Sequence, residues 1–138
     1  MAKFEILDHT ADVKIRAYGK TIEEVFEAAA VAFFAVIADL DGIHEQTSTI
    51  ITTQAINQEE LLVSWLNELL YHYEVKRLLL KRFEVSSLNH TSIRAAGFGE
   101  RLDPSRHVVH REVKMATYHQ LKVARDEHGF FAEAILDL

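Results

Sequence analysis

The stretch LDHTADVKIRAYG, residues 7–19, joins a cluster of ionisable side chains to a strand pattern. From Asp12 onward, apolar and polar residues alternate, and this period of two is typical of a strand with one buried face. Asp12 itself belongs to the polar face, and Asp8 and His9 stand just before the strand. A single aspartate in such a place is usually solvated or paired with a nearby base, so this stretch alone does not define a site.

Two helices are indicated further along the chain. Thr21 with Glu24 matches a capping box, and Asn57 with Glu60 has the same spacing, in each case ahead of apolar residues at helical intervals. β-Branched or alternating segments predict strands at 47–53, 81–88, 91–99, 117–125 and 129–138. Because most strands follow the helices, we expect an α+β fold over residues 1–138: a single domain with two amphipathic helices packed on a largely antiparallel sheet.

The composition limits the classes of function. Hydrophobic residues make up 49% of the 138, which favours one globular domain over a disordered chain. The absence of cysteine excludes a disulfide framework, a thiol nucleophile and a cysteine zinc site. A net charge of −6 predicts poor direct binding of nucleic acid. We found no signal-peptide pattern and no apolar run of membrane-spanning length, so we expect a cytoplasmic protein without a membrane partner.

The last residues supply a second acidic cluster. The chain ends AILDL, so the Asp137 side chain stands beside the α-carboxylate of Leu138, at the end of an apolar run that predicts an interior strand. If the two ends meet, the start of the first long strand lies beside the end of the last, and the two strands are antiparallel neighbours. Together with Asp12 these carboxylates would suit a hard divalent cation such as Ca²⁺, Mg²⁺ or Mn²⁺.

Other candidate motifs are weaker. His107, His110 and His119 match no zinc-binding spacing, and the GFG at 97–99 is too short for a phosphate-binding loop. By spacing alone, Lys114 is a polar residue beside a strand, which indicates a solvated face.

Several blocks, taken together, resemble the archease family. They occur in the family's order, and the match runs from about Phe4 to Leu138. Lys14 departs from the family pattern, in which a small residue is expected, and it brings a positive charge near the predicted metal site. The matching blocks are DHTADV (8–13), YGKTIEEVFEAAAVAF (18–33), LLVSWLNELLYHYE (61–74), FGERLDPSRH (98–107), EVKMATYHQLKV (112–123) and the terminal LDL.

The resemblance implies a function that composition does not. Archeases are accessory proteins of the tRNA-splicing ligase, which joins RNA ends bearing a cyclic or 3′-phosphate to 5′-hydroxyl ends. They promote guanylylation and multiple turnover of that ligase and are not ligases themselves. The resemblance places the family's metal ligands at Asp12, Asp137 and Leu138, and its functionally important lysine at Lys114. Asp8 and His9 are then expected to position the ligands or to face a partner.

Two alternatives remain open from the sequence. An older proposal for the family is a chaperone or specificity modulator of a tRNA methyltransferase. The same carboxylates could also serve a metal-dependent phosphoesterase, although that chemistry requires an activated water and no additional general base is evident.

Overall fold

The computed structural model describes residues 2–8 and 11–138. Within them the chain alternates strands and helices before ending in four successive strands. The elements are β1 (Lys3–Asp8), β2 (Asp12–Gly19), α1 (Ile22–Ile37), the 3₁₀ turn η1 (Leu40–Gly42), β3 (Thr47–Gln54), α2 (Gln58–Glu74), β4 (Leu78–Leu88), β5 (Ser92–Arg101), β6 (Met115–Asp126) and β7 (Gly129–Asp137).

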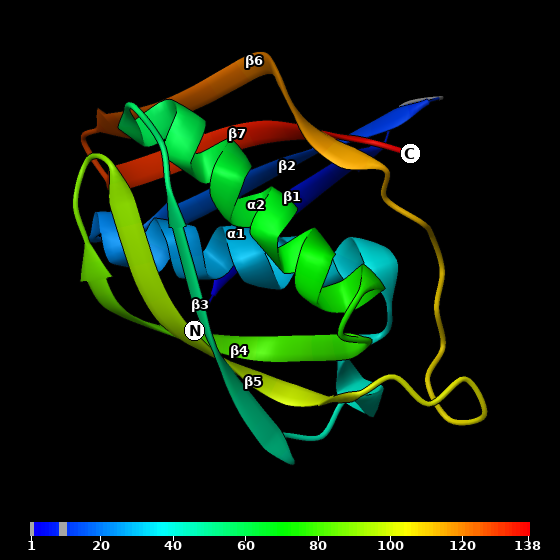
Figure 1. The fold of residues 1–138 in the computed structure, drawn as a ribbon. Helices are drawn as coiled ribbons and strands as arrows, with labels where there is room; N and C mark the ends of the chain where they lie inside the picture. The colour runs from blue at the N-terminus through cyan, green and yellow to red at the C-terminus, as the bar shows by residue number, and fades with distance from the viewer. Residues whose placement is uncertain (1, 9–10) are drawn as a thin grey trace.

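The strands form two antiparallel sheets with both helices between them. One sheet has the order β1-β2-β7-β6, and the other has the order β3-β5-β4. Figure 1 shows α1 packed between β2 and β4, and α2 between β6 and β3. The predicted α+β class is therefore confirmed, with the strands divided between two sheets that cover the helices from opposite sides.

The predicted helix starts are confirmed by their caps. Thr21 Oγ1 accepts the amide hydrogen of Glu24 at 3.2 Å, and Glu24 Oε1 accepts that of Lys20 at 2.8 Å. Asn57 Oδ1 likewise accepts the amide hydrogen of Glu60 at 2.9 Å. The Thr21 and Asn57 side chains thus satisfy amides that the first turn of each helix leaves without a partner.

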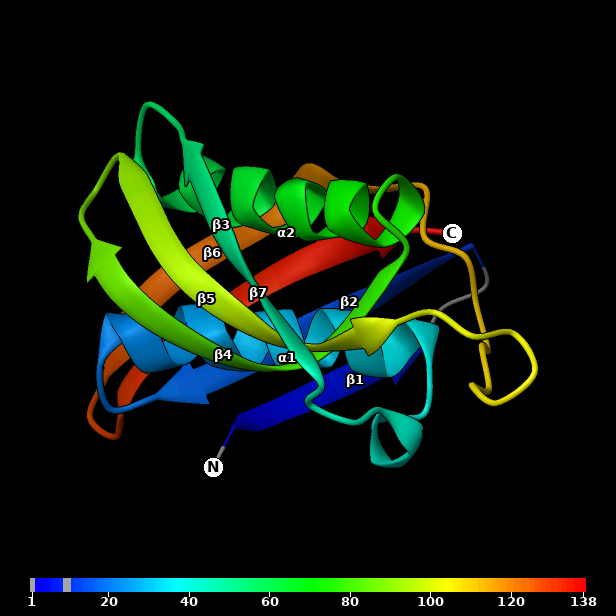
Figure 2. The same ribbon diagram turned by 60° about the horizontal axis from the view of Figure 1, so that its bottom comes forward.

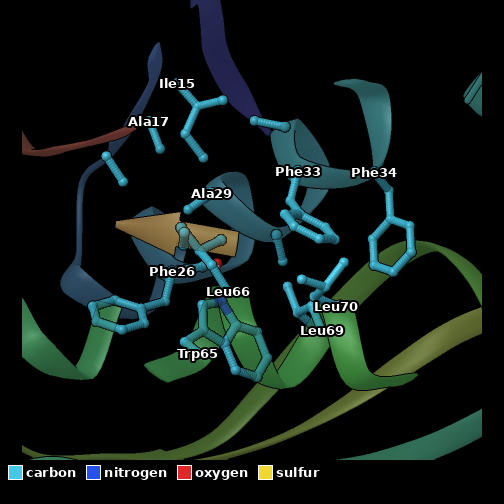
Figure 3. Close-up of a cluster of buried hydrophobic side chains, with 14 of the residues drawn as sticks. Ile15, Ala17, Phe26, Ala29, Phe33, Phe34, Trp65, Leu66, Leu69 and Leu70 are labelled. Atoms are coloured by element: carbon cyan, nitrogen blue, oxygen red, sulfur yellow. Dashed lines mark hydrogen bonds between the residues drawn. The ribbon is translucent and has the colours of Figure 1, made fainter. Parts of the chain in front are cut away.

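The core fills the space between the sheets. From Ala28 to its end at Ile37, α1 has no polar residue, which suits a helix that is covered on both sides. Figure 3 shows Phe26 and Phe33 of α1 on the side of α2, where Trp65 is fully buried. The indole Nε1 of Trp65 donates a hydrogen bond to the carbonyl oxygen of Phe26 at 3.0 Å, so the one polar atom of this side chain is satisfied.

The first sheet also contains an edge strand, β1, and a tight turn between β6 and β7. β1 was not expected from the sequence; it pairs with β2 along its whole length and turns half-buried Phe4 and Ile6 toward the core. A tight turn connects β6 to the last strand, since Asp126 pairs with Gly129. Gly129 has φ +136°, and a Cβ there would stand 2.6 Å from the Gly19 carbonyl oxygen, so glycine is required.

Among the described residues, neither helix is long and apolar enough to cross a membrane.

Candidate functional site at the paired ends of β2 and β7

The two acidic ends of the chain meet in the first sheet. β2 pairs antiparallel with β7 in a register that places Asp12 directly opposite Asp137. Leu138 continues the pairing, because its amide donates to the Ala11 carbonyl oxygen at 3.3 Å. Figure 1 shows the C-terminal end of β7 beside the start of β2. The expectation that these strands are antiparallel neighbours is therefore confirmed.

This register brings two carboxylates to one face of the sheet. Val13, next to Asp12, is buried against the helices, so Asp12 belongs to the outer face. Side chains directly opposite in an antiparallel pair have Cβ atoms about 4.5–5.5 Å apart and share a face. Asp137 therefore joins Asp12 on the outer face, and both side chains are half-buried. We call these two residues the aspartate pair.

The aspartate pair has no internal counter-charge among residues 2–8 and 11–138. Neither carboxylate forms an ion pair or a hydrogen bond with another side chain or amide in that part of the chain. The next basic residue on the same face, Lys14, lies opposite Ile135 instead. Like charges held opposite one another in a sheet are destabilising, and a cation would offset that repulsion.

The donor chemistry of the aspartate pair fits a hard divalent cation. Carboxylate oxygens are the ligands that Ca²⁺, Mg²⁺ and Mn²⁺ prefer. In the described residues no group of three or more histidine, aspartate or glutamate side chains gathers for a metal, so a third donor must have another source. The backbone of Leu138 lies beside Ala11 at the same end of the sheet, while His9 lies outside the described residues.

Lys114 adjoins the aspartate pair through its backbone. Its amide donates to the Asp137 carbonyl oxygen at 2.8 Å, and Met115 follows directly opposite Asp137 at the start of β6. Asn67 of α2 anchors this point by bonding both backbone groups of Ala116, at 2.8 and 3.2 Å. Lys114 and Met115 are both exposed residues, and their backbone lies next to Asp137. Sequence reasoning missed Asn67 because its partner lies 49 residues away.

Asp8 is placed against the long segment that leads to Lys114. Arg111 Nη1 donates to Asp8 Oδ1 at 2.6 Å, and the two residues are 103 positions apart. This hydrogen bond raises the pKa of the Arg111 guanidinium above its ordinary value. Arg111, which sequence reasoning did not single out, thus ties the end of β1 to the segment at 102–114.

A second acidic group anchors the other end of that segment. Glu100 is buried, bonded by the Arg106 guanidinium, and lies 3.0 Å from His107 Nε2. The Glu100 oxygen that faces His107, Oε2, also accepts the His44 amide hydrogen at 2.6 Å. His107 Nδ1 accepts the Asp103 amide hydrogen at 2.8 Å, so the ring proton belongs on Nε2 and points to Glu100. These partners lower the pKa of Glu100 from 4.5 to about 2, and the hydrogen bond from Arg106 makes the largest contribution. We call these groups the Glu100 cluster.

Comparison with known proteins identifies the family of this chain. A family model described as the archease protein family matches residues 4–138. The chain belongs to the archease family.

Curated archeases resemble it over their whole length. Protein archease of Methanosarcina mazei is 39% identical over 140 residues, which cover 99% of this chain and 96% of that protein. Protein archease of Pyrococcus furiosus is 37% identical over 142 residues and covers all of both chains. The family predicted from the sequence blocks is confirmed.

The archease fold is confirmed by a solved structure. The solution structure of Methanobacterium thermoautotrophicum protein 1598 superposes with a TM-score of 0.84 at 31% identity, covering 98% of each chain. The arrangement of two helices and antiparallel sheets is therefore shared with an experimentally determined relative.

Proposed function

We propose that this chain is a non-catalytic activator of the tRNA-splicing RNA ligase, promoting its guanylylation and multiple turnover. Membership of the archease family supports an accessory role with RNA-processing enzymes. The proposal names the tRNA-splicing ligase as the RNA-processing enzyme that this chain assists. The observation that carries the proposal is the Asp12–Asp137 register, because it assembles the two ends that carry the family motif into a single surface.

In this proposal a hard divalent cation is held by Asp12, Asp137 and the Leu138 carboxylate. The cation would offset the repulsion between the aspartates. The chain itself contributes the positioning: the β2–β7 ladder holds both aspartates, and the Leu138–Ala11 hydrogen bond holds the chain end. Lys114 and Met115, exposed beside the pair, provide a charged and an apolar contact for the ligase.

The test of activation uses limiting ligase and an RNA that bears a 2′,3′-cyclic phosphate. We expect the purified chain alone to join no RNA and to increase the number of turnovers per ligase molecule. Ligation by the chain without ligase, or a ligase whose turnover is unchanged over a wide range of added protein, would contradict the proposal. Hydrolysis of generic phosphoesters with metal would support the phosphoesterase alternative. Stimulation of a tRNA methyltransferase without ligase stimulation would support the chaperone alternative.

The test of the metal site compares matched variants by calorimetric titration with Ca²⁺, Mg²⁺ and Mn²⁺. Asp12→Asn should weaken binding, remove metal-dependent thermal stabilisation and reduce ligase activation together. An extension after Leu138 should do the same, because it converts the carboxylate into an amide. Asp41→Asn removes an exposed carboxylate in η1 and should bind as the wild type does. Equal affinity in all four proteins would show that the two ends do not build a metal site.

A further inference from the structure

The two sheets end in four edge strands, β1, β6, β3 and β4, and these differ in how they are protected. An edge strand offers unpaired N–H and C=O groups to any other strand, and proteins usually guard such edges with charges, bulges or side-chain caps. Figures 1 and 2 show β3 at the margin of its sheet, with β5 on one side and no strand on the other.

Three of the edges carry such guards. β1 contains Lys3 and Glu5. β6 carries charged residues and an irregular register between Thr117 and Lys122. β4 is also charged, and its Val85 amide is already bonded to a carboxylate oxygen of α1, Glu27 Oε2, at 2.8 Å. Each of these edges therefore resists pairing with a further strand.

β3 lacks every one of these guards. Its sequence, TSTIITTQ, has no charged residue and no proline, and its register with β5 runs without a shift from Thr47 to Gln54. Most of its residues are β-branched, which favours strand pairing. Ile50 is 52% exposed, so the strand also presents an apolar side chain beside its open edge.

The register identifies which backbone groups of β3 point outward. The Ala55 amide donates to the Thr91 carbonyl oxygen at 2.9 Å, which makes these two residues a hydrogen-bonded pair. Such pairs recur at every second residue of an antiparallel ladder, so the odd-numbered residues of β3 bond to β5. The residues between them direct their N–H and C=O groups away from β5. These outward residues are Ser48, Ile50, Thr52 and Gln54.

We propose that the edge of β3 pairs with the same edge of a second copy, giving a symmetric dimer with a continuous sheet across the interface. One antiparallel register uses all the outward groups: Ser48 pairs with Gln54 of the second copy and Ile50 with Thr52, with the two-fold axis at Ile51. Each outward residue then both donates and accepts. Both Ile50 side chains lie on one face of the joined sheet, close to the axis, where they exclude water from each other.

Charge selects a second copy as the occupant. The chain carries a net charge of −6, so two copies repel each other over most of their surfaces. β3 contributes no charge, and in this register uncharged side chains lie opposite uncharged side chains. A symmetric contact at the β1 edge would instead bring Lys3, Glu5 and Asp8 into the interface. The uncharged edge is therefore where copies approach at the lowest electrostatic cost.

The first test measures molar mass by light scattering across a broad concentration series. The wild type should approach twice the 15.8 kDa mass of one chain as concentration rises. Ile50→Lys places two ammonium groups near the axis and should raise the dimer dissociation constant by at least about tenfold. The matched control is Ile56→Lys, which introduces the same charge at an 81% exposed position outside the strand and should dimerise as the wild type does.

A second pair of variants separates dimerisation from folding. Thr52→Pro removes an outward amide, which an edge strand tolerates, and should abolish the dimer with little change in melting temperature. Thr53→Pro removes an amide directed at β5 and should lower the melting temperature instead. Hydrogen exchange of the Ile50 and Thr52 amides should slow as concentration rises. A wild type that stays monomeric at the highest concentration, or a dimer that persists in both Ile50→Lys and Thr52→Pro, would overturn the proposal.

Discussion

Glu100 and the aspartate pair differ in what surrounds their carboxylates. Glu100 is buried, and a guanidinium, an imidazole and a backbone amide all bond to it from within the chain. Asp12 and Asp137 are half-buried and face each other, with no ion pair to any other described residue. The first group has its counter-charge built in, whereas the second gathers negative charge at a surface.

The difference separates a structural use of carboxylates from a binding use. A buried carboxylate that is fully hydrogen-bonded stabilises the native state, because its partners lose their bonds when it is removed. Two carboxylates that oppose each other work against folding until something positive binds them. Stability measurements without metal should therefore respond with opposite signs at the two places.

The largest expected effect is at the Glu100 cluster. Glu100→Gln removes the negative charge that Arg106 and His107 bond to, and should lower the free energy of unfolding by about 1.5–3 kcal/mol. Urea denaturation of this variant and of Glu112→Gln measures the change. Glu112 is exposed and forms no ion pair with the described residues, so its variant should match the wild type. Equal stability of all three proteins would show that the Glu100 cluster does not hold the segment.

The same cluster predicts an acid limb in the stability profile. Because the folded-state pKa of Glu100 is lowered from 4.5 to about 2, its contribution is complete above about pH 4.5 and is lost as pH falls toward about 2. Unfolding free energies measured over this range should fall less steeply in Glu100→Gln than in the wild type. Parallel curves for the two proteins would mean that other carboxylates account for the acid limb.

At the aspartate pair the sign should reverse. With chelator present, Asp12→Asn relieves the repulsion with Asp137 and should raise the free energy of unfolding by up to about 1 kcal/mol. Adding divalent cation should then stabilise the wild type more than the variant. A loss of stability in Asp12→Asn without metal, comparable to that of Glu100→Gln, would reveal an internal partner and remove the contrast between the two groups.

The smallest effect on stability is expected at Lys114. Its side chain is exposed, and its hydrogen bond to Asp137 comes from the backbone, which substitution preserves. Lys114→Ala should therefore leave the melting temperature close to that of the wild type while lowering ligase stimulation. Full stimulation combined with a lowered melting temperature would make Lys114 a structural residue.

Local sequence patterns predicted most of the helices and strands. The acidic residues at the two ends of the chain predicted one of the strand pairings. Alternation gave the position of β2, and the capping residues Thr21 and Asn57 gave both helix starts. The two acidic ends led to the β2–β7 neighbourhood, because shared ligands require their strands to be adjacent. Whether a metal binds there stays a prediction.

Other features depend on contacts that no local pattern encodes. β1 is a short edge strand, and its half-buried side chains give a weak alternation. The division into two sheets depends on which strands pair, although the run of apolar residues from Ala28 to Ile37 is a signal that α1 is covered on both sides. Glu100 receives one of its bonds from His44, 56 residues away, so its cluster exists only in the folded chain.

The order of β2 and β7 has a consequence for how the chain folds during synthesis. β7 is the last strand along the chain, yet it lies between β2 and β6, and it meets β2 in contacts such as Arg16–Glu133, 117 residues apart. Until β7 is synthesised, β2 can pair only with β1. The edges of β2 and β6 that will later bond to β7 are then left open. Closing contacts of such long sequence separation is slow and leaves the unfinished sheet open to aggregation. A nascent chain halted before Gly129 should therefore be a strong client for chaperones.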